Sequence, residues 1–241
     1  MSEQTGSRSG GWLAIILASV AGIAIGAAGM LYFGPSADEA RVGQIVHNYV
    51  MENPELLPAA MEELERKQAS AAVAPRLAQF QTPYAGAWAG AQDGDVVLVE
   101  FFDYACGYCR ATNATVDRLL AEDPKLKVVW RELPVLGPDS QEAAVASLAA
   151  AEQGRFRQFH TALFAGGRPT PQAVAQAQAQ AGVRPAAATE GHRQELSRNM
   201  ELANAIRATG TPTFVVGEQV FHGAVPYEDL KAAIDRARSG A

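Results

Sequence analysis

The sequence "DVVLVEFFDYACGYCRA", residues 95–111, decides the fold of this 241-residue chain and contains its two cysteines. Residues Asp95–Asp103 form an almost continuous apolar run of strand length, rich in β-branched and aromatic side chains. Such a run is typical of a strand that is buried on both faces of a sheet. A helix is predicted from Gly107 to about Glu122, so Cys106 lies at its start and Cys109 lies about one helical turn further on.

The segments that follow predict a mixed α/β domain. "KLKVVWREL", residues 125–133, reads as a second buried strand, and strand, helix, strand implies a right-handed parallel unit. Residues 137 to about 208 show helical patterns throughout. "TPTFVVGEQVFHG", residues 211–223, contains two short apolar runs around a glycine, which predicts a hairpin before a closing helix from about Pro226 to Arg238.

The net charge and the N-terminal segment indicate where the protein works. A formal charge of -6 and a pI near 5.3 argue against a nucleic-acid partner. Trp12–Phe33 is an uncharged apolar stretch that is long enough to span a bilayer as a helix, which takes about 20 residues. We therefore expect a cytoplasmic N-terminus at residues 1–11, an inner-membrane anchor at 12–33 and the rest of the chain in the periplasm, where disulfides persist. A cleaved signal peptide, which leaves a soluble periplasmic protein, is the alternative.

A helical stalk is predicted between the anchor and the α/β domain, over residues 38–80. Val42, Ile45, Val46 and Tyr49 follow the spacing of one apolar helix face, and a second helix is expected to start near Leu57. This face must be buried, either on a second copy of the chain or on the α/β domain itself. Self-association into a homo-oligomer is the favoured interpretation.

The C-x-x-C pair is interpreted as a redox-active disulfide, with no metal and no other cofactor. A structural zinc site needs four ligands, and haem attachment needs a histidine where Arg110 stands. A disulfide between such close neighbours closes a very short loop, so it would add little to the stability of the fold. The four histidines are scattered rather than paired with the cysteines: His47, His160, His192 and His222. His160 lies on an apolar helix face and is expected to be a core residue.

Each residue of the pair has a predicted chemical role. The backbone N–H groups and the dipole at the start of the helix stabilise a thiolate at Cys106, which is expected to be the nucleophile. Cys109 then resolves the mixed disulfide. Gly107 and Tyr108 form the active-site loop between them, and Gly107 leaves the backbone amides accessible to sulfur. Arg110 is placed either near the thiolate or in solvent.

Glu100 is a carboxyl inside an otherwise apolar strand. Desolvation should raise its pKa, which makes it a candidate acceptor for the proton of Cys109. The alternative is a strand-end carboxylate that contacts water or pairs with Arg131 or Lys127.

"VEFFDYACGYCR" and, further along the chain, "GTPTFVVG" resemble the DsbA family of thiol-disulfide oxidoreductases. This resemblance implies a thioredoxin fold over residues 83–241, with a helical insertion at about 138–208. It also implies that Pro212 is cis and lies beside the cysteines, with Thr211 before it to pair with an extended client segment. The anchored stalk resembles the membrane-tethered ScsC-like and Com1-like groups.

The direction of catalysis is inferred from the residues between the cysteines. Gly-Tyr at this position, Thr before the proline and an oligomerising stalk resemble isomerases of the DsbC type, whereas DsbA-like oxidases often carry Pro-His. We expect a disulfide isomerase or reductase that acts on cysteine-containing secreted proteins and is recycled by a membrane partner of the DsbB or DsbD type. A DsbA-like oxidase is the alternative, and a non-enzymatic Cu(I)-binding thiol module is less favoured.

Overall fold

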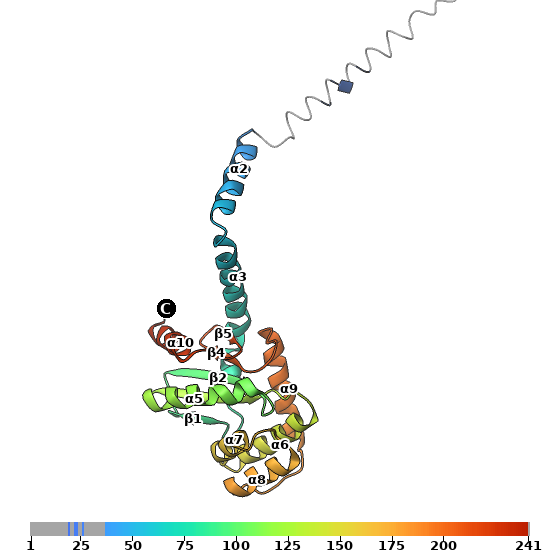
Figure 1. The fold of residues 1–241 in the computed structure, drawn as a ribbon, viewed down its shortest axis with the longest axis vertical. Helices are drawn as coiled ribbons and strands as arrows, with labels where there is room; N and C mark the ends of the chain where they lie inside the picture. Colours follow the sequence, from blue (N-terminus) through green and yellow to red (C-terminus); the bar gives the residue numbers. More distant parts are fainter. Residues whose placement is uncertain (1–18, 20–21, 24–25, 27–36, 241) are drawn as a thin grey trace, which may run out of the picture. The chain divides into compact units, whose positions relative to one another are not determined.

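The computed structural model describes residues 19, 22, 23, 26 and 37–240, and the chain divides into two compact units, residues 1–61 and 62–241 (Figure 1). In the first unit, helix α2 (Ala37–Glu52) is followed by the beginning of α3 (Leu56–Val73). The predicted span at 12–33 lies outside the described residues apart from positions 19, 22, 23 and 26. Within the described part of the chain, no helix is long and apolar enough to cross a membrane.

The apolar stripe of the stalk is exposed. More than half of the surface of Val42, Ile45 and Tyr49 on α2, and of Leu57 and Met61 on α3, is accessible to solvent. The stripe is therefore not buried within its own unit.

The second unit is built on a five-stranded sheet, which confirms the predicted mixed α/β fold. The strands are β1 (Trp88–Gly90), β2 (Val96–Phe102), β3 (Leu126–Glu132), β4 (Thr213–Val216) and β5 (Gln219–His222), in the order β1-β3-β2-β4-β5. Strands β2 and β3 are parallel and are joined by α5 (Gly107–Glu122), as the sequence predicts. The other strand pairs are antiparallel, including the β4–β5 hairpin before α10 (Tyr227–Ser239).

Both faces of the central strands are buried, because helices cover each side of the sheet. One face presents Leu98, Phe102 and Trp130 to a core that includes residues of α5 and α10 and of the helical insertion. The other face presents Phe101 and Val129 to a core that also contains residues of α3, the short helix α4 (Leu77–Gln81) and α9. A short 3-10 turn, Ala74–Arg76, precedes α4.

The helical insertion consists of α6 (Pro138–Glu152), α7 (Phe156–Ala165), α8 (Pro171–Ala181) and α9 (Glu190–Ala205). Helices α6, α7 and α8 lie together at one end of the domain (Figure 1). The run of alanines and glutamines that has a period-2 pattern is helical, because Thr170 caps its start and the left-handed Gly182 ends it. Six alanines of α6 are buried, so this helix is closely packed by its neighbours.

Candidate active site

Cys106 is the N-cap residue of α5, where the strand-to-helix turn ends. Its sulfur accepts a hydrogen bond from the backbone N–H of Cys109 at 3.4 Å. Both residues are free thiols, and Cys106 is 6% exposed whereas Cys109 is completely buried. Because the first N–H groups of a helix lack partners within the helix, this position favours a negative charge on the sulfur.

The loop before β4 lies against the same sulfur. The thiol of Cys106 donates a hydrogen bond to the carbonyl oxygen of Thr211 at 3.1 Å. The Thr211–Pro212 peptide is cis, as the resemblance to the DsbA family implies. Pro212 is fixed from its other side, because its carbonyl oxygen accepts a hydrogen bond from the N–H of Gly223 at 2.8 Å. Two segments far apart in the sequence therefore meet at one thiol.

Asp103 holds the turn that carries Cys106, and the sequence reasoning did not single it out. One of its carboxylate oxygens accepts a hydrogen bond from the N–H of Ala105 at 2.8 Å. The other accepts from the N–H groups of Val135 and Leu136 at 2.9 and 3.0 Å. An Asp directly after a buried strand and before a turn is a signal for this kind of side-chain-to-backbone bonding.

Asp103 therefore joins the cysteine turn to the turn between β3 and α6. Val135 and Leu136 on that second turn are 46% and 53% exposed, and Tyr108 between the cysteines is 69% exposed. Large apolar side chains are thus exposed on the cysteine turn and on the turn that Asp103 joins to it, whereas the thiol itself is almost buried.

Glu100 lies on β2, beneath the cysteine turn, and is 1% exposed. Its Oε2 accepts a hydrogen bond from the indole N–H of Trp130 at 2.9 Å, whereas its Oε1 has no hydrogen-bond partner among the described residues. Burial raises the pKa of Glu100 to about 8. The pKa of Cys109 is raised far above its usual range, first by burial and then by the charge of Glu100.

Neither basic residue considered as a partner of Glu100 fills that role. Arg131 is buried on the opposite face of the sheet, where it pairs with Glu195 at 3.0 Å and donates hydrogen bonds to carbonyl groups at the end of α4. Lys127 donates to the carbonyl oxygen of Gln92 at 3.2 Å and lies over the ring of Trp88. The strand alternation that points Glu100 towards α5 points Arg131 away from it.

His160 is a core residue, as predicted. It packs against the rings of Phe102 and Trp130, and burial holds its pKa well below the usual range, so the imidazole is neutral. Its Nδ1 lies 3.3 Å from the hydroxyl of Tyr104, which lies 2.8 Å from the hydroxyl of Ser147. Arg110 is exposed, in keeping with the solvent alternative, and it donates hydrogen bonds to the carbonyl oxygens of Phe164 and Gly167 at and just beyond the end of α7.

No group of three or more histidine, cysteine or acidic side chains is arranged to hold a metal ion within the part of the chain that the structure describes.

Two family descriptions match this chain. The DSBA-like thioredoxin domain matches residues 97–235, and the copper resistance protein ScsC N-terminal domain matches residues 38–71. Among solved structures, a linker-deletion mutant of Proteus mirabilis ScsC is 25% identical, with a TM-score of 0.70, over 86% of this chain and 98% of that one. A thioredoxin-like oxidoreductase from Silicibacter pomeroyi DSS-3 is 37% identical, with a TM-score of 0.63, over 67% of this chain and 96% of that one.

A curated relative is much longer than this chain. The Na(+)/H(+) antiporter NhaA 3 of Salinispora tropica is 29% identical over 251 aligned residues, which is 96% of this chain but 38% of the antiporter.

Proposed function

Because this chain belongs to the family of DSBA-like thioredoxin domains, we propose that it is a thiol-disulfide oxidoreductase that acts on cysteine-containing client proteins through Cys106 and Cys109. One observation carries this proposal. The sulfur of Cys106 lies at the start of α5 and 3.1 Å from the carbonyl oxygen of Thr211, next to a cis proline, while Cys109 is buried behind it. This arrangement supports Cys106 as the sulfur that meets a client and Cys109 as the sulfur that releases it.

The proposed reaction has two steps in the reducing direction. The Cys106 thiolate attacks one sulfur of a client disulfide, so an enzyme–client S–S bond forms and the other client sulfur leaves as a thiolate that takes a proton from solvent. Glu100 then accepts the proton of Cys109. The Cys109 thiolate attacks the sulfur of Cys106, and the S–S bond to the client breaks. The client sulfur leaves as a thiolate that takes a proton from solvent, so the client is released as a dithiol and the enzyme is left as a disulfide.

In the isomerase direction, a client thiolate attacks the mixed disulfide instead of Cys109. A new disulfide then forms within the client, Cys106 leaves as a thiolate, and no net oxidation occurs. We favour isomerase or reductase activity because Gly107 and Tyr108 stand between the cysteines and because the stalk offers a face for self-association. Oxidase activity is the runner-up, and the same dithiol supports it when a membrane partner reoxidises the enzyme.

The stalk is the proposed oligomerisation region. Its apolar stripe is exposed, and the match to the ScsC N-terminal domain covers the same residues, 38–71. A stripe of this kind on a marginal helix gains stability from burial against another copy of itself. We place the protein in the periplasm, tethered to the inner membrane by residues 12–33, and recycled there by a partner of the DsbB or DsbD type.

Replacing Ile45 and Leu57 together by Asp tests the stalk. We expect the variant to be monomeric by light scattering, whereas Gln44→Asp on the same helix keeps the oligomer. An unchanged mass for the double variant would assign self-association to other residues.

Two assays test the activity and its direction. The protein should reduce insulin in the presence of a thiol reductant and restore activity to scrambled ribonuclease. Ribonuclease rescue that is lost in the monomeric stalk variant, with insulin reduction retained, supports an isomerase. Rapid oxidation of a reduced client without rescue of scrambled ribonuclease supports an oxidase. Inactivity in every assay would contradict the proposed function.

A further inference from the structure

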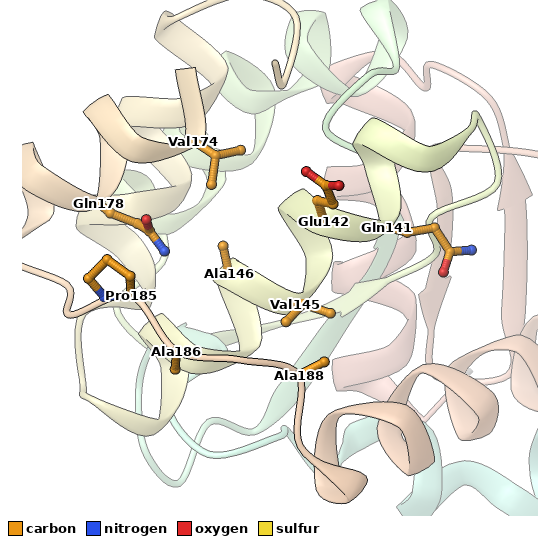
Figure 2. Close-up of a pocket in the computed structure, with 9 residues that line it drawn as sticks. All are labelled: Gln141, Glu142, Val145, Ala146, Val174, Gln178, Pro185, Ala186 and Ala188. Atoms are coloured by element: carbon orange, nitrogen blue, oxygen red, sulfur yellow. The ribbon is translucent and has the colours of Figure 1, made fainter. Parts of the chain in front are cut away.

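A groove of about 450 Å³ opens on the helical insertion, away from the cysteines. Figure 2 shows Val174 and Gln178 on α8 and Ala146 on α6 on opposite sides of it, with the chain segment that carries Pro185 and Ala186 passing beside them. Its volume falls within the range of about 300–1,000 Å³ that is typical of ligand pockets. Its full lining is Gln141, Glu142, Val145, Ala146, Val174, Gln178, Pro185, Ala186 and Ala188.

Small residues create this groove, because alanines stand where larger side chains would fill the space. Ala146 is buried beneath it, whereas Ala186 and Ala188 are exposed along one wall. The walls are largely apolar, and polar groups are contributed by the amides of Gln141 and Gln178 and the carboxylate of Glu142. Glu142 forms no ion pair with a basic side chain of the described residues, so the groove is apolar with an acidic margin.

One hydrogen bond links the lining of the groove to the turn that Asp103 joins to the cysteine turn. Gln141, which lines the groove, donates a hydrogen bond to the carbonyl oxygen of Pro134 at 3.4 Å, on the turn that carries Val135 and Leu136. Across residues 74–240, four large apolar side chains are exposed, and three of them lie on the cysteine turn or on the turn that Asp103 joins to it. A chain that leaves Cys106 across the Val135–Leu136 turn reaches the N-terminal end of α6.

We propose that this groove is a second subsite for clients, which holds an extended segment on one side of the cysteine that is joined to Cys106. The segment crosses Val135 and Leu136, inserts an aliphatic side chain beside Ala186, and places a lysine or arginine near Glu142. Pro138 to Ala146 spans about 12 Å of helix, or about four residues of extended chain. The path from Cys106 to Pro138 adds to this length, so the aliphatic residue is expected more than about four positions from the client cysteine. This inference rests on the proposed function and adds a sequence preference to it.

The test uses the full chain with Cys109→Ser, which cannot resolve a mixed disulfide. Three peptides each carry one cysteine and are made with spacings of five to eight residues to the test position: the first has Leu there followed by Lys, the second has Ser in place of the Leu, and the third has Glu in place of the Lys. The equilibrium constant for mixed-disulfide formation is measured against glutathione. We expect the first peptide to be favoured over the second by about tenfold, as partial burial of a leucine side chain predicts.

Neighbouring alanines provide a matched pair of groove variants. Ala186→Phe fills the groove and should abolish the preference for Leu, whereas Ala187→Phe, at an exposed position that does not line the groove, should keep it. Ala188→Phe repeats the test if Ala186→Phe unfolds at a lower temperature than Ala187→Phe. Glu142→Gln should remove the discrimination between Lys and Glu and leave the preference for Leu.

The possible failures are distinguishable. Equal constants for all three peptides, or equal preferences in Ala186→Phe and Ala187→Phe, would overturn the subsite while exchange with glutathione disulfide still supports the proposed function. A chain that exchanges with neither peptides nor glutathione disulfide lacks the proposed function itself. A small molecule that is bound in the groove and leaves peptide preferences unchanged would also overturn the proposal.

Discussion

The buried carboxyl of Glu100 gives the sharpest prediction, because it links stability and catalysis to one proton. Its pKa is about 8 in the folded protein, compared with a usual value of 4.5. The folded state therefore binds this proton more tightly than the unfolded state, and the free energy of unfolding must fall as pH rises from about 4.5 to about 8. At about 1.4 kcal/mol per pKa unit, the loss is on the order of 5 kcal/mol over the whole window and about 3 kcal/mol by pH 7.

Glu100→Gln removes this titration and keeps an acceptor for the indole N–H of Trp130. The variant should be more stable than the wild type by about 3 kcal/mol near pH 7, and by about 1 kcal/mol or less near pH 5. Any fixed cost of burying the amide is the same at every pH. The informative quantity is therefore how the stability difference between the variant and the wild type changes with pH. Urea unfolding of the reduced proteins at several pH values measures it.

The same substitution should slow the release of clients. In the wild type, the rate at which Cys109 resolves a mixed disulfide should rise with pH up to about 8, because Glu100 must be ionised to accept a proton. Glu100→Gln should lose this rise and react about 100-fold more slowly, which is the lower end of the usual contribution of a general base. Rapid-quench measurements with a peptide disulfide report this rate.

Glu132→Gln is the matched control, since Glu132 is a second buried carboxyl whose pKa is raised by burial, at the end of β3. It should also flatten the pH dependence of stability, but it should leave the release rate unchanged. Two results together would contradict this account: a stability difference between Glu100→Gln and the wild type that is the same at every pH, and a release rate equal to that of the wild type. Glu100 would then neither titrate as described nor accept the proton of Cys109.

Three further changes test the site and its frame. Cys109→Ser should accumulate mixed disulfides with clients on non-reducing gels, whereas Cys106→Ser should accumulate none; adducts with Cys106→Ser alone would reverse the assigned roles. Asp103→Ala should lower the free energy of unfolding by about 3 kcal/mol, because three backbone N–H groups lose a charged acceptor; a loss below about 1 kcal/mol in urea titration would show that the turns hold without it. Arg131→Leu removes the buried partner of Glu195 and leaves it only the exposed Arg198 at 3.5 Å, so it should cost about 3 kcal/mol in the same measurement; wild-type stability would contradict this account of the pair.

Much of the fold could be predicted from the sequence, because local patterns there agree with the final structure. The apolar runs at 95–103 and 125–133 contain the parallel strands β2 and β3, and the glycine at 217 marks the hairpin between β4 and β5. The second stalk helix starts at Leu56, one residue from the expected position, because Pro58 is tolerated only in the first turn.

The features that could not be predicted all depend on which segments meet in space. Arg131 is a possible partner for Glu100 in the sequence, but the alternation of β3 places it on the opposite face, against Glu195. Asp103 looks like an ordinary strand-end residue in the sequence, and its role depends on Val135 and Leu136, which follow a different strand. The groove depends on the approach of α8 and residues 185–188 to α6, which no local pattern records.

The hydrogen bond from the Cys106 thiol to the Thr211 carbonyl couples two equilibria. When the thiol loses its proton, the carbonyl oxygen loses its donor and faces an anion, so an incoming amide N–H from a client backbone gains in attraction there. Thermodynamic linkage makes this effect reciprocal: a docked segment must favour the thiolate as strongly as the thiolate favours docking.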